Sequence, residues 1–134
     1  MDFTFSEPVD TSKFKLEATR STPYVFYDSS VAILELKGRS SPESSIDFYS
    51  KILDKLEAFE IEKQSSITVN VAFEYFNTSS AKCVFDMFKR LKNLSEKGKN
   101  VVLNWYYEED DDDMFEAGED FGYLLKLDIN LLEH

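Results

Sequence analysis

The sequence is poor in the residues from which zinc sites and nucleophilic catalytic sites are commonly built. It has one cysteine and one histidine among 134 residues. Cys83 has no partner for an internal disulfide and falls within a predicted helix, a position typical of a small core side chain. His134 is the last residue. These shortages exclude histidine-based catalytic triads and zinc sites made of cysteine and histidine.

Positive charge and long apolar runs are also scarce. Fifteen lysines and arginines stand against 26 aspartates and glutamates, which leaves a formal charge of −11. Such a chain repels phosphate backbones and anionic lipids, so nucleic acid and membrane surfaces are excluded as partners. No apolar run reaches transmembrane length, and Met1–Pro8 lacks the bases and apolar core of a signal peptide. We therefore expect a cytoplasmic protein.

Aromatic and aliphatic residues are plentiful. The chain is 43% hydrophobic and contains 12 phenylalanines, seven tyrosines and one tryptophan, enough for a real core. No repeat, linker or low-complexity tail divides it. We expect a single domain over residues 1–131. Leu132-Glu133-His134 is similar to the remnant of an expression tag, and we leave these three residues out of the fold prediction.

The periodicity predicts an α/β fold, in which helices cover a mixed sheet in the order β-β-(β)-α-β-α-β-α. Phe14 and Leu16 alternate with lysines, as in a short edge strand. A hairpin follows, with strands over residues 24–27 and 31–38. Ser41 as N-cap and Pro42 as the first helical residue then begin a helix that ends near Phe59.

The second half of the chain continues this alternation. Val69, Val71, Phe73 and Tyr75 are expected on one face of a strand. Helical spacing returns over residues 81–94 and again over 114–125. Between these helices, residues 101–107 are nearly all bulky β-formers, which predicts a strand that is buried on both faces and lies at or next to the centre of the sheet.

The turn Asn77-Thr78-Ser79-Ser80 joins the third predicted strand to the second helix. One of its first three residues should be the N-cap, because their side-chain oxygens accept hydrogen bonds from free N–H groups. Simple capping explains the turn without any function. A phosphorylatable switch is the alternative, since a phosphate at a helix N-terminus meets backbone donors and the positive end of the dipole.

Three loops should meet at the carboxyl edge of the parallel strands, where α/β proteins usually place their sites. They are residues 38–41, 76–80 and 106–113. Arg39 would attract a phosphate on Thr78, whereas the six acids of residues 108–113 would repel it. Those acids also fit a solvated loop or a weak cation site, although they lack the EF-hand pattern.

Four motifs carry a resemblance to a known family. They are Tyr75–Lys82, Trp105–Asp111 continuing to Met114, Gly118–Phe121, and Gly38-Arg39-Ser40 with Pro42-Glu43. Together they resemble the SiaC family of bacterial regulatory phosphoproteins, over residues 24–121. The stretch Ser41–Ser45 departs from the family pattern, which more often has an apolar residue before the proline.

The resemblance implies a domain similar to the STAS-type anti-sigma-factor antagonists. It implies a protein without catalytic residues or a cofactor, phosphorylated by a partner kinase and restored by a metal-dependent serine/threonine phosphatase. Its unphosphorylated form would bind and activate a diguanylate cyclase. The phosphoacceptor would be Thr78. The expected surroundings are Asn77, Ser79, Ser80, Lys82 and Arg39, and the partner-binding candidates are Arg39, Ser40, Tyr106, Tyr107, Glu108, Glu109, Asp110 and Asp111.

Two alternatives stay open beside this interpretation. The first is a cation-dependent enzyme or binding protein that uses Glu108–Asp113. The second is an interaction domain whose acidic face mimics a nucleic acid. We expect no tightly bound catalytic metal, because consecutive carboxylates in a flexible loop lack the fixed spacing of a committed site.

Overall fold

The computed structural model describes residues 12–134, which form one six-stranded mixed sheet. The strands lie in chain order from edge to edge. The first three pair antiparallel, and the last four, from β3 onward, run parallel. The strands are β1 (Lys13–Leu16), β2 (Tyr24–Asp28), β3 (Ile33–Ser40), β4 (Ser66–Phe76), β5 (Asn100–Tyr107) and β6 (Asn130–Glu133). The predicted α/β mixed sheet is confirmed; the STAS-type likeness stays a prediction.

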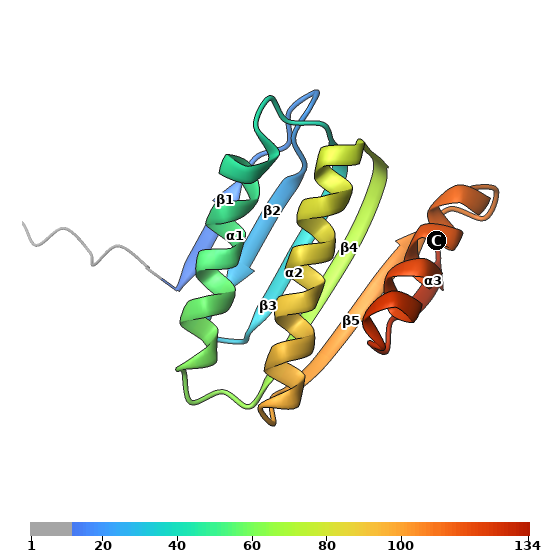
Figure 1. The fold of residues 1–134 in the computed structure, drawn as a ribbon. Helices are drawn as coiled ribbons and strands as arrows, with labels where there is room; N and C mark the ends of the chain where they lie inside the picture. The colour runs from blue at the N-terminus through green and yellow to red at the C-terminus, as the bar shows by residue number, and fades with distance from the viewer. Residues whose placement is uncertain (1–11) are drawn as a thin grey trace, which may run out of the picture.

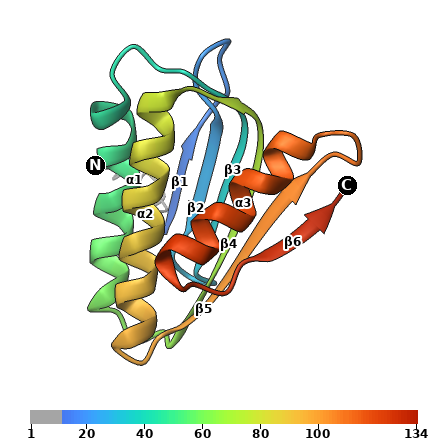
Figure 2. The same ribbon diagram turned by 45° about the vertical axis from the view of Figure 1, so that its right-hand side comes forward.

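Three helices connect the parallel strands and lie on the same face of the sheet (Figures 1 and 2). They are α1 (Ser45–Glu60), α2 (Thr78–Glu96) and α3 (Asp112–Leu125). Consecutive right-handed crossovers between neighbouring strands place every helix on one side. The core lies between the two layers, and its largest fully buried side chain is Trp105. Within residues 12–134, none of these helices is long and apolar enough to span a membrane.

Because only one face is covered, the predicted burial of residues 101–107 on both faces is wrong. Leu103 and Trp105 point into the core, whereas Asn104 and Tyr106 are half-buried on the opposite face. The predicted position is confirmed, since β5 lies next to the central strands. The bulky side chains of β5 therefore lie on one buried face and one half-buried face of the sheet.

The helix α1 begins three residues later than predicted. Ser44 is the N-cap, and its hydroxyl accepts a hydrogen bond from the Asp47 amide at 3.3 Å. Pro42 is instead buried in the loop after β3. Ser44, whose hydroxyl bonds a free amide of the first turn, is therefore the N-cap in place of the predicted Ser41.

The sheet also contains a strand that the sequence pattern did not predict. In β6, Leu132 pairs with Tyr106 and Glu133 pairs with Tyr107. Leu132 and Glu133, which were left out of the fold prediction as part of a tag remnant, therefore belong to the sheet. His134 lies just beyond the strand, where its amide donates to the Tyr107 carbonyl at 2.9 Å.

One β-bulge interrupts the alternation of β4. Gly38 pairs with Phe73, but Arg39 pairs with Tyr75, so Glu74 is an extra residue. Beyond it Phe76, rather than Tyr75, takes the core-facing position. The prediction for Tyr75 was therefore wrong at the one residue that follows the bulge.

Candidate functional site

The turn between β4 and α2 places Thr78 at the first residue of a helix. Asn77 is the N-cap, and its side-chain oxygen accepts hydrogen bonds from the Ser80 amide at 2.8 Å and from the Ser79 hydroxyl at 3.2 Å. No acidic residue lies in the first turn of α2. The predicted capping is confirmed, and this turn leaves the positive end of the helix dipole without an opposing charge.

A buried cluster of hydroxyls supports the turn from below. Ser40, at the end of β3, lies 2.6 Å from the Tyr49 hydroxyl and donates to Ser80 Oγ at 2.8 Å. Ser40 and Ser80 are fully buried, and Tyr49 is almost so. Buried polar groups that are hydrogen-bonded to one another fix a single arrangement. This cluster therefore holds the first turn of α2 to β3 and α1.

A second hydroxyl pair joins the N-terminal ends of the two helices nearer the surface. Ser45, the first residue of α1, has its Oγ 2.8 Å from Ser79 Oγ. The bond bridges residues that are 34 positions apart in the chain. The N-termini of α1 and α2 therefore form one shared end of the molecule, at the top of Figure 1.

These contacts distinguish the three hydroxyls of the turn. Ser80 is sealed in the core, and Ser79 is engaged by Ser45 and Asn77. The Thr78 side chain is exposed, and its hydroxyl has no hydrogen-bond partner among residues 12–134. Of the three, Thr78 alone presents a free hydroxyl to solvent.

The two basic residues predicted near Thr78 are placed differently. Lys82 is exposed and lies four residues after Thr78, so both side chains lie on the same face of α2. Arg39 instead stacks over the ring of Tyr75, with its guanidinium carbon 4.8 Å from the ring centre. The structure thus brings Lys82, rather than Arg39, to the flank of Thr78.

The acidic run is more ordered than predicted. Glu108, Glu109 and Asp110 form a turn, Asp111 is the N-cap of α3, and its carboxylate accepts from the Met114 amide at 3.0 Å. Asp112 and Asp113 lie in the first turn of that helix, where negative charge is favourable. Helix capping explains half of the run, and within residues 12–134 no group of three or more acids, histidines or cysteines could hold a metal ion.

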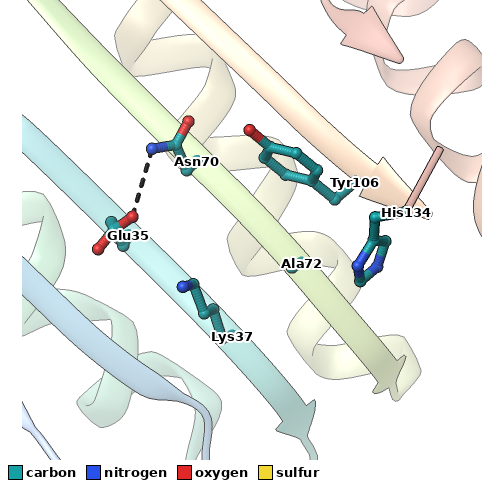
Figure 3. A pocket seen from close by; sticks show the side chains of 6 residues that line it. All are labelled: Glu35, Lys37, Asn70, Ala72, Tyr106 and His134. Atoms are coloured by element: carbon teal, nitrogen blue, oxygen red, sulfur yellow. Dashed lines mark hydrogen bonds between the residues drawn. The ribbon is translucent and has the colours of Figure 1, made fainter. Parts of the chain in front are cut away.

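The two tyrosines at the end of β5 point to opposite faces of the sheet. Tyr107 packs edge-on against Phe115 of α3, with ring centres 5.0 Å apart. Tyr106 lies on the uncovered face, in a hollow of about 260 Å³ that Glu35, Lys37 and Asn70 also line (Figure 3). The predicted common rim is therefore divided, because Tyr106 and Arg39 lie away from the helix layer that carries Thr78.

The uncovered face carries a row of three amides and one carboxylate that crosses four strands. Asn130 donates to Asn104 at 3.0 Å, Asn104 to Asn70 at 2.9 Å, and Asn70 to the Glu35 carboxylate at 3.4 Å. The four residues occupy the same register position from β3 to β6. The row joins neighbouring strands side chain to side chain.

Burial in the hydroxyl cluster has an electrostatic consequence for Tyr49. Removal from water raises the pKa of this phenol to about 12, and the hydrogen bonds with Ser40 and Ser80 oppose the rise in part. The hydroxyl is therefore a neutral donor at physiological pH.

The support under the turn was missed by sequence reasoning. Ser45 and Tyr49 both fall within the first predicted helix, but neither was predicted to contribute to the site. The Ser44-Ser45 pair was a signal for this support. One serine is enough to cap a helix, so the second hydroxyl was available for a contact with another element.

The chain is similar to proteins of Pseudomonas aeruginosa. The profile of the family described as SiaC family regulatory phosphoprotein matches residues 16–134. An uncharacterized protein of strain UCBPP-PA14 is 29% identical over 110 residues, which cover 82% of this chain and 87% of that protein.

Solved structures agree with this match. The crystal structure of apo-SiaC has a TM-score of 0.82 at 27% identity, and the match covers 90% of this chain and 98% of that one. SiaC in complex with the diguanylate cyclase SiaD, of which it is the activator, gives a TM-score of 0.85 at 26% identity, covering 90% and 99%. The chain belongs to the SiaC family of regulatory phosphoproteins.

Proposed function

We propose that this protein is a non-enzymatic switch, in which reversible phosphorylation of Thr78 decides whether it binds and activates a diguanylate cyclase. The observation that carries the proposal is the free, exposed hydroxyl of Thr78, which precedes two serines whose hydroxyls are engaged. A cognate kinase would add the phosphate, and a metal-dependent serine/threonine phosphatase would remove it. The cyclase is inferred from the complex that the related SiaC forms.

The fold tolerates a phosphate at this position. A phosphothreonine adds about −1.5 to −2 charges at neutral pH. The first turn of α2 holds no acid, and Lys82 lies one turn further along the same face. Both features favour the added charge. Phosphorylation should therefore alter the surface of the protein without unfolding it.

Phosphorylation should leave the fold intact but weaken binding to the cyclase. The partner's surface, which fits the small hydroxyl of Thr78, would have to accommodate a bulky dianion. Burying that charge without an opposite charge costs several kcal/mol. We expect a loss of affinity on the order of a hundredfold or more. The acidic run takes part in capping α3 and does not require a separate catalytic role.

The test is calorimetry with the cognate cyclase and three forms of the protein: unmodified, stoichiometrically phosphorylated, and Thr78→Ala. The unmodified and Thr78→Ala forms should bind equally, and the phosphorylated form should bind at least a hundredfold more weakly. Ser79→Ala is the matched control, because it should still accept one phosphate. Equal affinities for the unmodified and phosphorylated forms would refute the proposal.

A further inference from the structure

A large aliphatic side chain lies exposed at the shared end of α1 and α2. Ile46, the second residue of α1, is 76% exposed to solvent, whereas Tyr49 and Ile52 of the same helix are buried. Single exposed aliphatic residues are common in soluble proteins, so exposure alone implies nothing. The position of Ile46 is the informative feature.

Ile46 is tied to the Thr78 turn by the hydroxyl pair. Ser45 precedes Ile46, Ser79 follows Thr78, and their Oγ atoms are 2.8 Å apart. A groove of about 450 Å³ runs between the two helices at this point. Its lining combines apolar Ile46 and Cys83 with charged Glu43, Lys82 and Asp86. Protein interfaces likewise combine apolar residues with polar and charged ones.

We infer that the diguanylate cyclase docks on this end of the molecule, with Ile46 as its apolar anchor. The Ile46 surface, as we name it, comprises Glu43, Ile46, Ser79, Lys82 and Asp86. The inference rests on the proposed function, because a phosphate at Thr78 weakens binding most when the partner covers its surroundings. Charge effects across solvent are largely screened beyond about 10 Å.

The other exposed apolar side chains do not meet this condition. Ile61 lies at the opposite end of α1, and Tyr123 and Leu124 lie at the C-terminal end of α3. Val31 lies in the turn before β3, and Leu132 lies in the edge strand β6. Tyr75 is close in sequence to Thr78, but Arg39 stacks over its ring. Among residues 12–134, Ile46 is therefore the large exposed aliphatic residue beside the first turn of α2. The binding energy of an interface concentrates in a few residues.

The experiment compares Ile46→Ala with Ile61→Ala. Ile61 is the C-cap of the same helix and is 88% exposed, so it controls for residue type and exposure. Fifteen residues at 1.5 Å each separate the two positions by roughly 22 Å. Calorimetry with the cognate cyclase and unphosphorylated protein should give at least a tenfold loss of affinity for Ile46→Ala and less than a twofold change for Ile61→Ala.

The outcomes separate this inference from the proposed function. If Ile46→Ala binds as tightly as Ile61→Ala while phosphorylation still abolishes wild-type binding, the docking surface is wrong and the switch stands. If Ile46→Ala binds the cyclase normally but is phosphorylated slowly, the surface belongs to the kinase, and the inference is equally wrong. If unphosphorylated wild-type protein does not bind the cyclase, both fall. Equal urea midpoints for the two variants exclude a folding defect.

Discussion

The N-terminal ends of α2 and α3 follow neighbouring parallel strands, yet they are built from opposite chemistry. The α2 end has a neutral cap, Asn77, and no acid in its first turn. The α3 end has an anionic cap, Asp111, followed by Asp112 and Asp113. Both helix dipoles favour negative charge at this point. Only the α3 end carries that charge in its own sequence, so the α2 end can accept a charge that a modification supplies.

The two ends also differ in what lies beneath them. Buried hydroxyls of Ser40, Tyr49 and Ser80 support the start of α2. Under α3, the Trp105 indole donates to the Met114 carbonyl at 2.9 Å, and Gly118 lies so close that an added Cβ would stand 2.6 Å from Trp105 Cδ1. The α2 end therefore rests on a polar support, and the α3 end on an aromatic one.

The largest effect that should separate the two ends is alkaline destabilisation at the α2 end. The folded-state pKa of Tyr49 is about 12, above the ordinary value near 10. Between these values the unfolded chain loses its proton first, so stability falls as pH rises and is unaffected below pH 10. Two pKa units correspond to about 2.7 kcal/mol. Urea unfolding from pH 8 to 12 should show a shallower loss for Tyr49→Phe than for wild type.

Tyr27→Phe separates the effect of the hydrogen bond from the effect of burial. Burial raises the pKa of Tyr27 to about 12 as well, but its hydroxyl has no hydrogen-bond partner within residues 12–134. At pH 8, Tyr49→Phe should cost about 1 kcal/mol for the lost bond to Ser40, and Tyr27→Phe should cost nothing. Parallel pH profiles for Tyr49→Phe and wild type would show that the phenol is not sealed as described.

The caps should give the next largest difference. Asn77→Ala and Asp111→Ala each remove a side chain that bonds a free amide of the first turn, at a cost of about 0.5 to 2 kcal/mol. Asp111→Ala should cost more, because it also removes charge from the helix dipole. Urea unfolding at low and high salt measures the loss of stability in each variant. Added salt should reduce the difference between the two losses. Equal costs at low salt would contradict the electrostatic contrast between the two ends.

Single charges in the first turns should give the smallest effect. Thr78→Asp adds a carboxylate to the uncharged α2 end and should stabilise the protein by about 0.3 to 1 kcal/mol. Asp113→Asn removes one from α3 and should destabilise it by a similar amount. Thermal unfolding of both variants at low ionic strength provides the measurement. Destabilisation by Thr78→Asp would mean that the α2 end cannot accept negative charge.

The local sequence pattern was sufficient to predict the α/β class and the start of α2. The change of period after Phe76 located the start of α2 to within one residue, because capping chemistry acts over three or four neighbouring positions. The burial of residues 101–107 was predicted wrongly, since bulky β-formers alone cannot show whether one face or two are covered.

The support beneath Thr78 could not be read from local pattern. Ser40 and Ser80 are 40 residues apart and meet because β3 and β4 pair in parallel. Arg39 was expected beside Thr78 because both belong to the same edge of the sheet. Arg39 instead lies on the uncovered face, because its neighbour Ser40 takes the buried position at the end of β3.

The bulge at Glu74 changes which residues of β4 face the core. Before it, odd-numbered residues such as Phe73 enter the core, and after it the even-numbered Phe76 does, against Trp105 and Phe121. The alternation of β4 therefore changes at Glu74, and Thr78 follows the second part of the strand as the first residue of α2. Loss of one residue at the bulge would turn every following side chain to the other face of the sheet. The orientation of Thr78 therefore depends on the number of residues in β4. A deletion in this strand should disturb the start of α2 more than a substitution should.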